Sequence, residues 1–186
     1  MNKTTAVIGL ALAAALFADA KSAKANNGND QEYVDMPVNF SVVPKLSVGE
    51  SVSKGRKVNN HMSFNMLAGA ASQLEGLELG AIWNHNYENG KGAQISGVTN
   101  TLGGNLAGAQ VAGINNHVHG NTVGGQVAGI VNANRGEVTG AQVAGIANVN
   151  AAKVTGVQFA GIANIAAGKV NGVQVSPIAN IAGKVN

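Results

Sequence analysis

The sequence predicts an all-β protein, a flattened two-sheet β-solenoid of stacked 16-residue coils that follows an N-terminal β cap. Three observations predict it: a short exact period, polar positions that never vary within it, and a composition of small residues. The repeat reads GAQISGVTN, GAQVAGINN, GGQVAGIVN, GAQVAGIAN, GVQFAGIAN and GVQVSPIAN between Gly92 and Asn180. The copies begin at glycines spaced by 16 residues, namely Gly92, Gly108, Gly124, Gly140, Gly156 and Gly172. Fixed self-similarity at a short period indicates one small unit stacked many times.

Two amide positions are constant in the repeat when its first glycine is counted as position zero. Position two is always glutamine: Gln94, Gln110, Gln126, Gln142, Gln158 and Gln174. Position eight is always asparagine: Asn100, Asn116, Asn132, Asn148, Asn164 and Asn180. Coils that stack about 4.8 Å apart place equivalent side chains in ladders. We therefore expect these amides to hydrogen-bond along the stack, which removes the cost of burying them.

Two other positions are always apolar, and we expect them to form the buried aliphatic ladders. Position three is Ile95, Val111, Val127, Val143, Phe159 and Val175, and position six is Val98, Ile114, Ile130, Ile146, Ile162 and Ile178. Each buried side chain of this size contributes about 1.5–3 kcal/mol at most. The small pair at positions four and five, usually Ala-Gly, predicts a tight bend between two short strands.

The composition restricts the classes of protein that fit. The chain has 186 residues, enough for one domain, with 26 glycines and only 4% aromatic residues. Charged residues make up 11% and the net charge is +3, so neither a charged disordered chain nor a strongly basic nucleic-acid binder fits. The absence of cysteine excludes disulfides, thiolate metal ligands and a cysteine nucleophile.

The first 35 residues are predicted to lie outside the solenoid. Residues 1–25 read as a signal peptide, with Lys3, an apolar run from Ala6 to Phe17 and a small-x-small cleavage site that ends at Ala25. Cleavage would leave Asn26 as the mature start, followed by a flexible polar segment over 26–35. This predicts export to the cell surface, outer membrane or periplasm of a Gram-negative-like bacterium.

The rest of the chain divides into a cap and the repeats. Residues 36–90 are predicted as the N-terminal cap and first degenerate coil, with a strand at 38–43, a loop at 45–60, an alternating segment at 61–69 and the weak copy GLELGAIWN from Gly76. Residues 91–186 are the solenoid repeats. In the last copy Ser176-Pro177 replaces Ala-Gly, which fits either a terminal cap or simple decay of the repeat.

An alternative architecture is a small outer-membrane β-barrel. Each nine-residue block has nearly the length of a tilted membrane-spanning strand. The repeats lack aromatic girdles, however, and their alternation of polar and apolar residues fails at the position-six isoleucine. The two architectures differ in strand direction, since coils stack in parallel and barrel neighbours run antiparallel.

Four segments resemble a bacterial family of exported surface repeat-containing proteins with tandem GVQIAGLFN-type units. They are VNFSVVP at 38–44, NNHMSFNMLAG at 59–69, LEGLELGAIWN at 74–84 and the six copies from Gly92, so the resemblance covers about residues 37–182. It implies an envelope or cell-surface location and no assigned enzymatic chemistry. The chain departs from longer members because it ends almost directly after the last repeat.

No catalytic, metal or cofactor-binding residue is predicted. His117 and His119 lack a third ligand nearby in the sequence, and Gly-x-Gln-x-Ala-Gly is a spacing of bends rather than of a phosphate loop. Lys153, Lys169 and Lys184 occupy equivalent bends and would form a short basic row. We expect a non-enzymatic scaffold or adhesin-like surface whose partner is envelope polysaccharide, a lipid surface or another copy of the chain, and not nucleic acid. The alternative function is that of a pore-like barrel.

Overall fold

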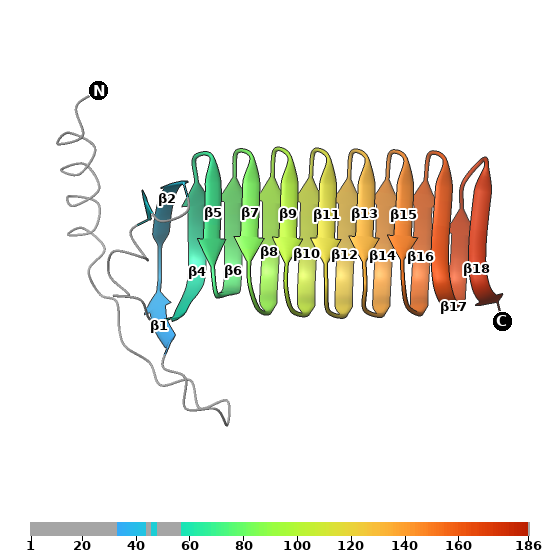
Figure 1. Ribbon diagram of the computed structural model, residues 1–186, viewed down its shortest axis with the longest axis horizontal. Coiled ribbons are helices and arrows are strands. Elements are labelled where there is room, and N and C mark those ends of the chain that lie inside the picture. The colour runs from blue at the N-terminus through green and yellow to red at the C-terminus, as the bar shows by residue number, and fades with distance from the viewer. Residues whose placement is uncertain (1–32, 44–45, 48–56, 186) are drawn as a thin grey trace.

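The computed structural model describes residues 33–43, 46–47 and 57–185, and every regular element among them is a β-strand. The strands wind into one elongated stack whose coils succeed one another along its long axis (Figure 1). No helix in the described part of the chain is long and apolar enough to cross a membrane. The predicted fold class, a β-solenoid of 16-residue coils, is confirmed.

Each regular coil consists of one long strand, a tight bend and one short strand. In one coil β10 (Leu106–Ala112) is followed by β11 (Asn115–Val118). The other long strands of the regular stack are β6 (Gln73–Gly80), β8 (Gly90–Ser96), β12 (Thr122–Ala128), β14 (Val138–Ala144) and β16 (Val154–Ala160). The other short strands are β5 (Ala68–Ala71), β7 (Trp83–Asn86), β9 (Thr99–Leu102), β13 (Val131–Asn134) and β15 (Ala147–Asn150).

Neighbouring coils pair in parallel and in register. Gln110 pairs with Gln126, Gln126 with Gln142 and Gln142 with Gln158, while the short strands pair Asn116 with Asn132 and Asn132 with Asn148. The barrel alternative required antiparallel neighbours and is therefore wrong.

The stack begins earlier than the repeat motif does. The strand β4 (Lys57–Asn65) pairs in parallel with β6, and it also receives β1 (Tyr33–Met36) and β2 (Asn39–Val43). A two-residue strand, β3 (Leu46–Ser47), runs antiparallel to β2. The predicted loop at 45–60 thus ends in strand, and so does the polar segment predicted over 26–35. The coil that contains β4 has a register shift between Asn60 and Met62, which hides it from a search for a strict 16-residue period.

In the C-terminal coils a short strand and the long strand that follows it form one continuous strand. Residues of β17 (Ala163–Val175) pair first with the short strand β15 and then with the long strand β16. The last strand, β18 (Ala179–Val185), continues in parallel but shifts register between Ala166 and Lys169. This shift matches the one residue by which the final unit is shorter than its predecessors.

The glycine at position zero is required by the backbone. Its φ is positive in every copy, for example 138° at Gly124. A Cβ added at Gly124 would lie 1.9 Å from the carbonyl oxygen of Gly108 in the coil before it. No side chain fits there, because the two coils approach each other through their backbones.

The interior is polar at its centre, contrary to the sequence-based expectation for the aliphatic ladders. The position-two glutamines and position-eight asparagines from Gln94 to Asn164 are fully buried, whereas the position-three residue Val127 is 46% exposed and Ile130 at position six is 37% exposed. The buried apolar side chains lie instead at positions minus two, four and ten, as in the clusters of Leu102, Leu106 and Val118 or of Val138, Val154, Ala166 and Val170. The expectation that positions three and six are buried was wrong. The isoleucines at position six recur in successive bends, but they are 37–75% exposed: Ile114, Ile130, Ile146, Ile162 and Ile178.

The glutamines are buried and the position-three residues are exposed because side chains alternate along the long strand. Successive residues of a strand face opposite sides of a sheet, so Gln126 and Val127 cannot both face the interior. The interior is narrow, and Gln126 shares its side with Thr122 and Ala128. Burying the glutamines therefore turns the position-three residues outward.

Candidate functional site

The interior glutamine ladder is directional and ends on a carboxylate. Each Gln Nε2 donates to the Oε1 of the preceding coil, with distances of 2.7–2.9 Å from Gln174 down to Gln110. Gln94 Nε2 then donates to Glu78 Oε2 at 2.9 Å. Glu78 occupies position two of the degenerate coil, and its register partner on β4 is Ser63 rather than another glutamine. A carboxylate suits this end, because it accepts hydrogen bonds without needing an acceptor beyond it.

The asparagine ladder runs in the opposite direction. Asn132 Nδ2 donates to Asn148 Oδ1 in the following coil at 2.9 Å and to the backbone carbonyl of Val143 at 2.8 Å. The same pair of bonds recurs from Asn84 to Asn164. Each asparagine thus ties one short strand to the next coil's long strand just before its bend.

The two ladders meet at Asn65. Its Nδ2 lies 2.9 Å from Glu78 Oε1 and 2.8 Å from Asn84 Oδ1, so its amide donates into both. Asn86 Nδ2 supplies a further bond to Glu78 Oε2 at 2.6 Å. Burial raises the pKa of the Glu78 carboxyl, and the hydrogen bonds from Gln94, Asn86 and Asn65 oppose that rise. Glu78 was not among the site residues predicted from the sequence, although its place at position two could have drawn attention to it.

The outer face of the long strands carries a continuous row of apolar side chains, here called the outer stripe. Its members are the position-three residues and their register partners at the N-terminal end: Phe40, Phe64, Leu79, Ile95, Val111, Val127, Val143, Phe159 and Val175. From Ile95 to Val175 these side chains are 40–47% exposed. Aliphatic side chains in one unbroken exposed row are characteristic of an interaction surface.

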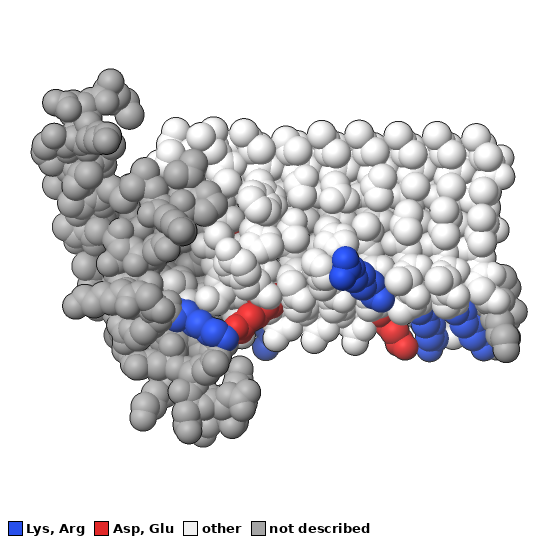
Figure 2. Space-filling model, in the orientation of Figure 1, with Lys and Arg blue, Asp and Glu red and all other residues white. Residues whose placement is uncertain are grey.

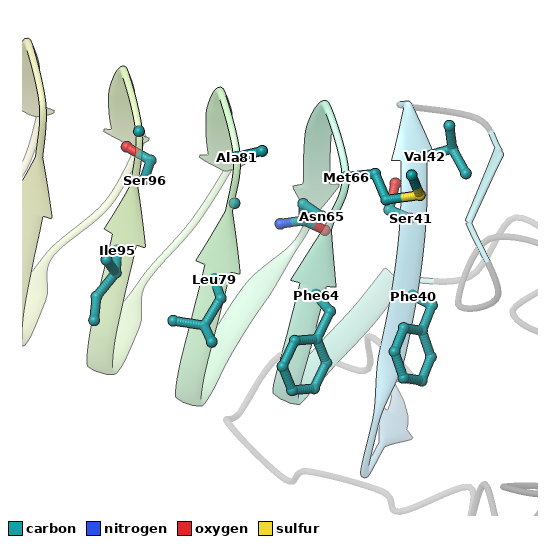
Figure 3. A pocket seen from close by; sticks show the side chains of 12 residues that line it. Phe40, Ser41, Val42, Phe64, Asn65, Met66, Leu79, Ala81, Ile95 and Ser96 are labelled. Carbon is teal, nitrogen blue, oxygen red and sulfur yellow. The ribbon is translucent and has the colours of Figure 1, made fainter.

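The N-terminal end of the outer stripe forms a shallow apolar groove of about 740 Å³. Figure 3 shows Phe40, Phe64, Leu79 and Ile95 side by side from four successive long strands, with Met66 and Ala81 nearer the bends. The rings of Phe40 and Phe64 stack with centroids 5.3 Å apart. The groove is part of the stripe and holds no cluster of polar groups that would suit a small polar ligand.

Charged side chains gather along one long edge of the stack (Figure 2). Arg135 and Glu137 lie in the bend between β13 and β14, Lys153 lies in the next such bend, and Lys169 occupies the equivalent place within β17. Lys184 pairs with Lys169 through the backbone. The predicted basic row of Lys153, Lys169 and Lys184 therefore occupies equivalent places in the last coils, and Glu137 occupies that place one coil earlier.

Three of the four histidines, His85, His117 and His119, lie in or next to short strands, whereas His61 lies in β4. The rings of His117 and His119 meet edge to face with centroids 4.5 Å apart, and His85 packs in the same way against Tyr87. Burial lowers the pKa of His117, and the charges of His119 and Arg135 lower it further. Within residues 33–43, 46–47 and 57–185 no group of three or more His, Cys, Asp or Glu side chains could hold a metal ion.

The remaining predicted site lies outside the described residues. Ala25 and Asn26, the predicted cleavage positions, precede the first described residue. No family model, curated protein or solved structure compared with the chain matches it.

Proposed function

We propose that the chain is a non-enzymatic, exported repeat protein of the bacterial cell envelope or surface that acts as a rigid scaffold and presents an extended binding surface. The observation that carries this proposal is the pair of opposed amide ladders, which link every regular coil to both of its neighbours through buried side chains. Such a chain of satisfied buried hydrogen bonds favours one register and a stiff rod. A rod with equivalent coils suits the display of a repeated surface better than the construction of one catalytic centre.

Export is the part of the proposal that rests on sequence alone. The supporting features are the basic start, the apolar run and the small-x-small motif that ends at Ala25. Location at the envelope also agrees with the resemblance described for residues 37–182.

The test expresses the full chain with a C-terminal tag in a Gram-negative bacterium. We expect N-terminal sequencing of the purified protein to begin at Asn26, and fractionation to recover it outside the cytoplasm. A protein recovered from the cytoplasm with an intact N-terminus would contradict export.

The scaffold role is tested by deleting one coil, residues 124–139. The deletion joins Gly108's coil to Gly140's coil in register, so both ladders can reform. We expect the shortened chain to retain a β-rich circular dichroism spectrum and cooperative unfolding. Loss of the fold would show that the coils are not interchangeable units, which contradicts the scaffold role.

A further inference from the structure

The outer stripe runs the whole length of the stack without a charged member. Nine side chains spaced about 4.8 Å apart make a row roughly 38 Å long. Between Gly92 and Asn134 the sequence contains no Lys, Arg, Asp or Glu at all. On the face of the long strands, Glu75 and Lys91 are register partners of opposite sign near the N-terminal end. An apolar surface of this length would be unusual on a soluble monomer.

A second row of outward-facing residues, most of them small, lies beside the outer stripe. Along each strand one inward-facing residue separates the two rows. These position-one residues are Ala93, Ala109, Gly125 and Ala141, with Val157 and Val173 in the last coils. The distance between the two rows is roughly 6.6 Å, the length of two extended residues. In the coils that begin at Gly92, Gly108, Gly124 and Gly140, the long-strand face is therefore a ridge beside a shallow furrow, whereas Val157 and Val173 fill the furrow in the last two coils.

A second copy of the chain has the surface that complements this relief. A two-fold axis parallel to the stack, running between the ridge and the furrow, places each ridge over the furrow of the other copy. The spacing along the ridge then matches by symmetry, because both copies have the same distance between coils. A lipid surface has no such periodic relief. The exposed aromatic residues Trp83 and Tyr87, of the kind that favours the membrane interface, belong to the segment around the short strand β7.

The size and charge of the face also suit a pair. Five residues of each long strand span roughly 17 Å, so the face covers roughly 600 Å² in projection and two copies would bury roughly 1,200 Å². That is the lower range of stable specific interfaces. Arg135 and Lys153 lie in the bends before β14 and β16, and Lys169 lies at the equivalent place in β17. These places are outside the five residues counted for the contact, so pairing does not bury the three charges.

We propose that the outer face of the long strands, centred on the outer stripe, is the interface of a symmetric dimer of this chain. The dimer presents two short-strand faces outward and removes both stripes from water. This interface is independent of where the protein is located and can be tested on purified chain.

The experiment compares two valine-to-lysine variants of the full chain. Val143 belongs to the stripe and Val149 to the short-strand face of the same coil, and the two are similarly exposed, at 43% and 39%. By sedimentation over a dilution series, we expect the wild-type chain to form dimers and Val143→Lys to raise the dissociation constant about 100-fold, since symmetry introduces the lysine twice. Val149→Lys should change it by less than about twofold.

Two further measurements complete the test. Circular dichroism of each variant at high dilution should show the wild-type spectrum, which separates loss of pairing from loss of folding. A short bismaleimide should cross-link Val143→Cys into dimers but not Val149→Cys, in a chain that has no cysteine of its own. The proposal is overturned if the wild-type chain is monomeric throughout, or if both lysine variants dissociate the dimer equally. It is equally overturned if the monomer binds phosphatidylethanolamine–phosphatidylglycerol vesicles through Val143.

Discussion

Gln126 and Val127 are adjacent in the sequence, but they belong to two regions with opposite chemistry. Gln126 is fully buried and hydrogen-bonds to the coils on both sides, whereas Val127 is 46% exposed on the outer stripe. Across the six regular copies the inner position is always glutamine, while the outer one is Ile, Val or Phe. The inner position requires one donor and one acceptor at a fixed place, whereas the outer position requires only an apolar surface.

The largest loss of stability is expected at the position where neighbouring coils touch through their backbones. We expect Gly124→Ala to destabilise the fold by about 4 kcal/mol or to prevent folding, because its Cβ would overlap the Gly108 carbonyl and its φ is positive. The control is Gly125→Ala, where a Cβ meets nothing within 4 Å. It should stay within about 0.5 kcal/mol of wild type in urea-induced unfolding. Equal effects of the two changes would contradict the close approach of the coils.

The next largest effect on stability is expected in the glutamine ladder, and it can be compared with a change in the adjacent outer stripe. Gln126→Leu leaves Gln110 Oε1 without its donor and Gln142 Nε2 without its acceptor. It also removes one of the two acceptors of Asn134 Nδ2, which keeps its bond to Asn150 Oδ1. We expect a loss of about 3 kcal/mol in the free energy of unfolding, although leucine is the more apolar residue. Val127→Ala should cost less than about 1 kcal/mol when measured on the monomer. A stabilising Gln126→Leu would show that the amide ladder is dispensable.

The smallest expected effect concerns the carboxylate at the end of the glutamine ladder. Because folding raises the pKa of Glu78, the folded chain holds its proton more tightly than the unfolded chain. The contribution of Glu78 to stability is therefore complete below its unfolded pKa and is lost as the pH rises through its folded pKa. Glu78→Gln removes this dependence.

The measurement is the difference in unfolding free energy between wild type and Glu78→Gln, taken from about pH 4 to about pH 8. Wild type should lose stability relative to the variant as the pH rises. His85 and His117, whose pKa values are lowered mainly by burial, are present in both chains, so their contributions largely cancel. A difference that does not change with pH would contradict the raised pKa of Glu78.

The period and the register could be predicted from the sequence because identical residues recur every 16 positions. Gln110, Gln126 and Gln142 could only lie in line if the coils stack, and the Asn positions impose the same register. The inside and outside could not be assigned from hydrophobicity, which favours burying Val127 and Ile130. The alternation of side chains along the strand was the available signal. Val138, Gln142 and Ala144 lie on one side of β14, and Val143 lies on the other.

The N-terminal coils were predicted less completely for a different physical reason. The coil of β4 lacks the Gly-x-Gln motif and contains a register shift, so nothing in it repeats at 16 residues. Its role at the end of the stack also differs. There Asn65 of β4 donates to Glu78 and to Asn84, and Glu78 stands at position two, where every later coil has glutamine.

Thiol reactivity tests the central claim, an amide interior with aliphatic side chains outside, most directly. The chain has no cysteine, so Val127→Cys and Ala128→Cys each introduce one thiol, on opposite sides of β12. At dilutions where the chain is monomeric, we expect the cysteine at 127 to react with maleimide about as fast as in urea, and the cysteine at 128 to be protected about 100-fold or more. Protection at 127 with free reaction at 128 would place the valines inside and contradict the account.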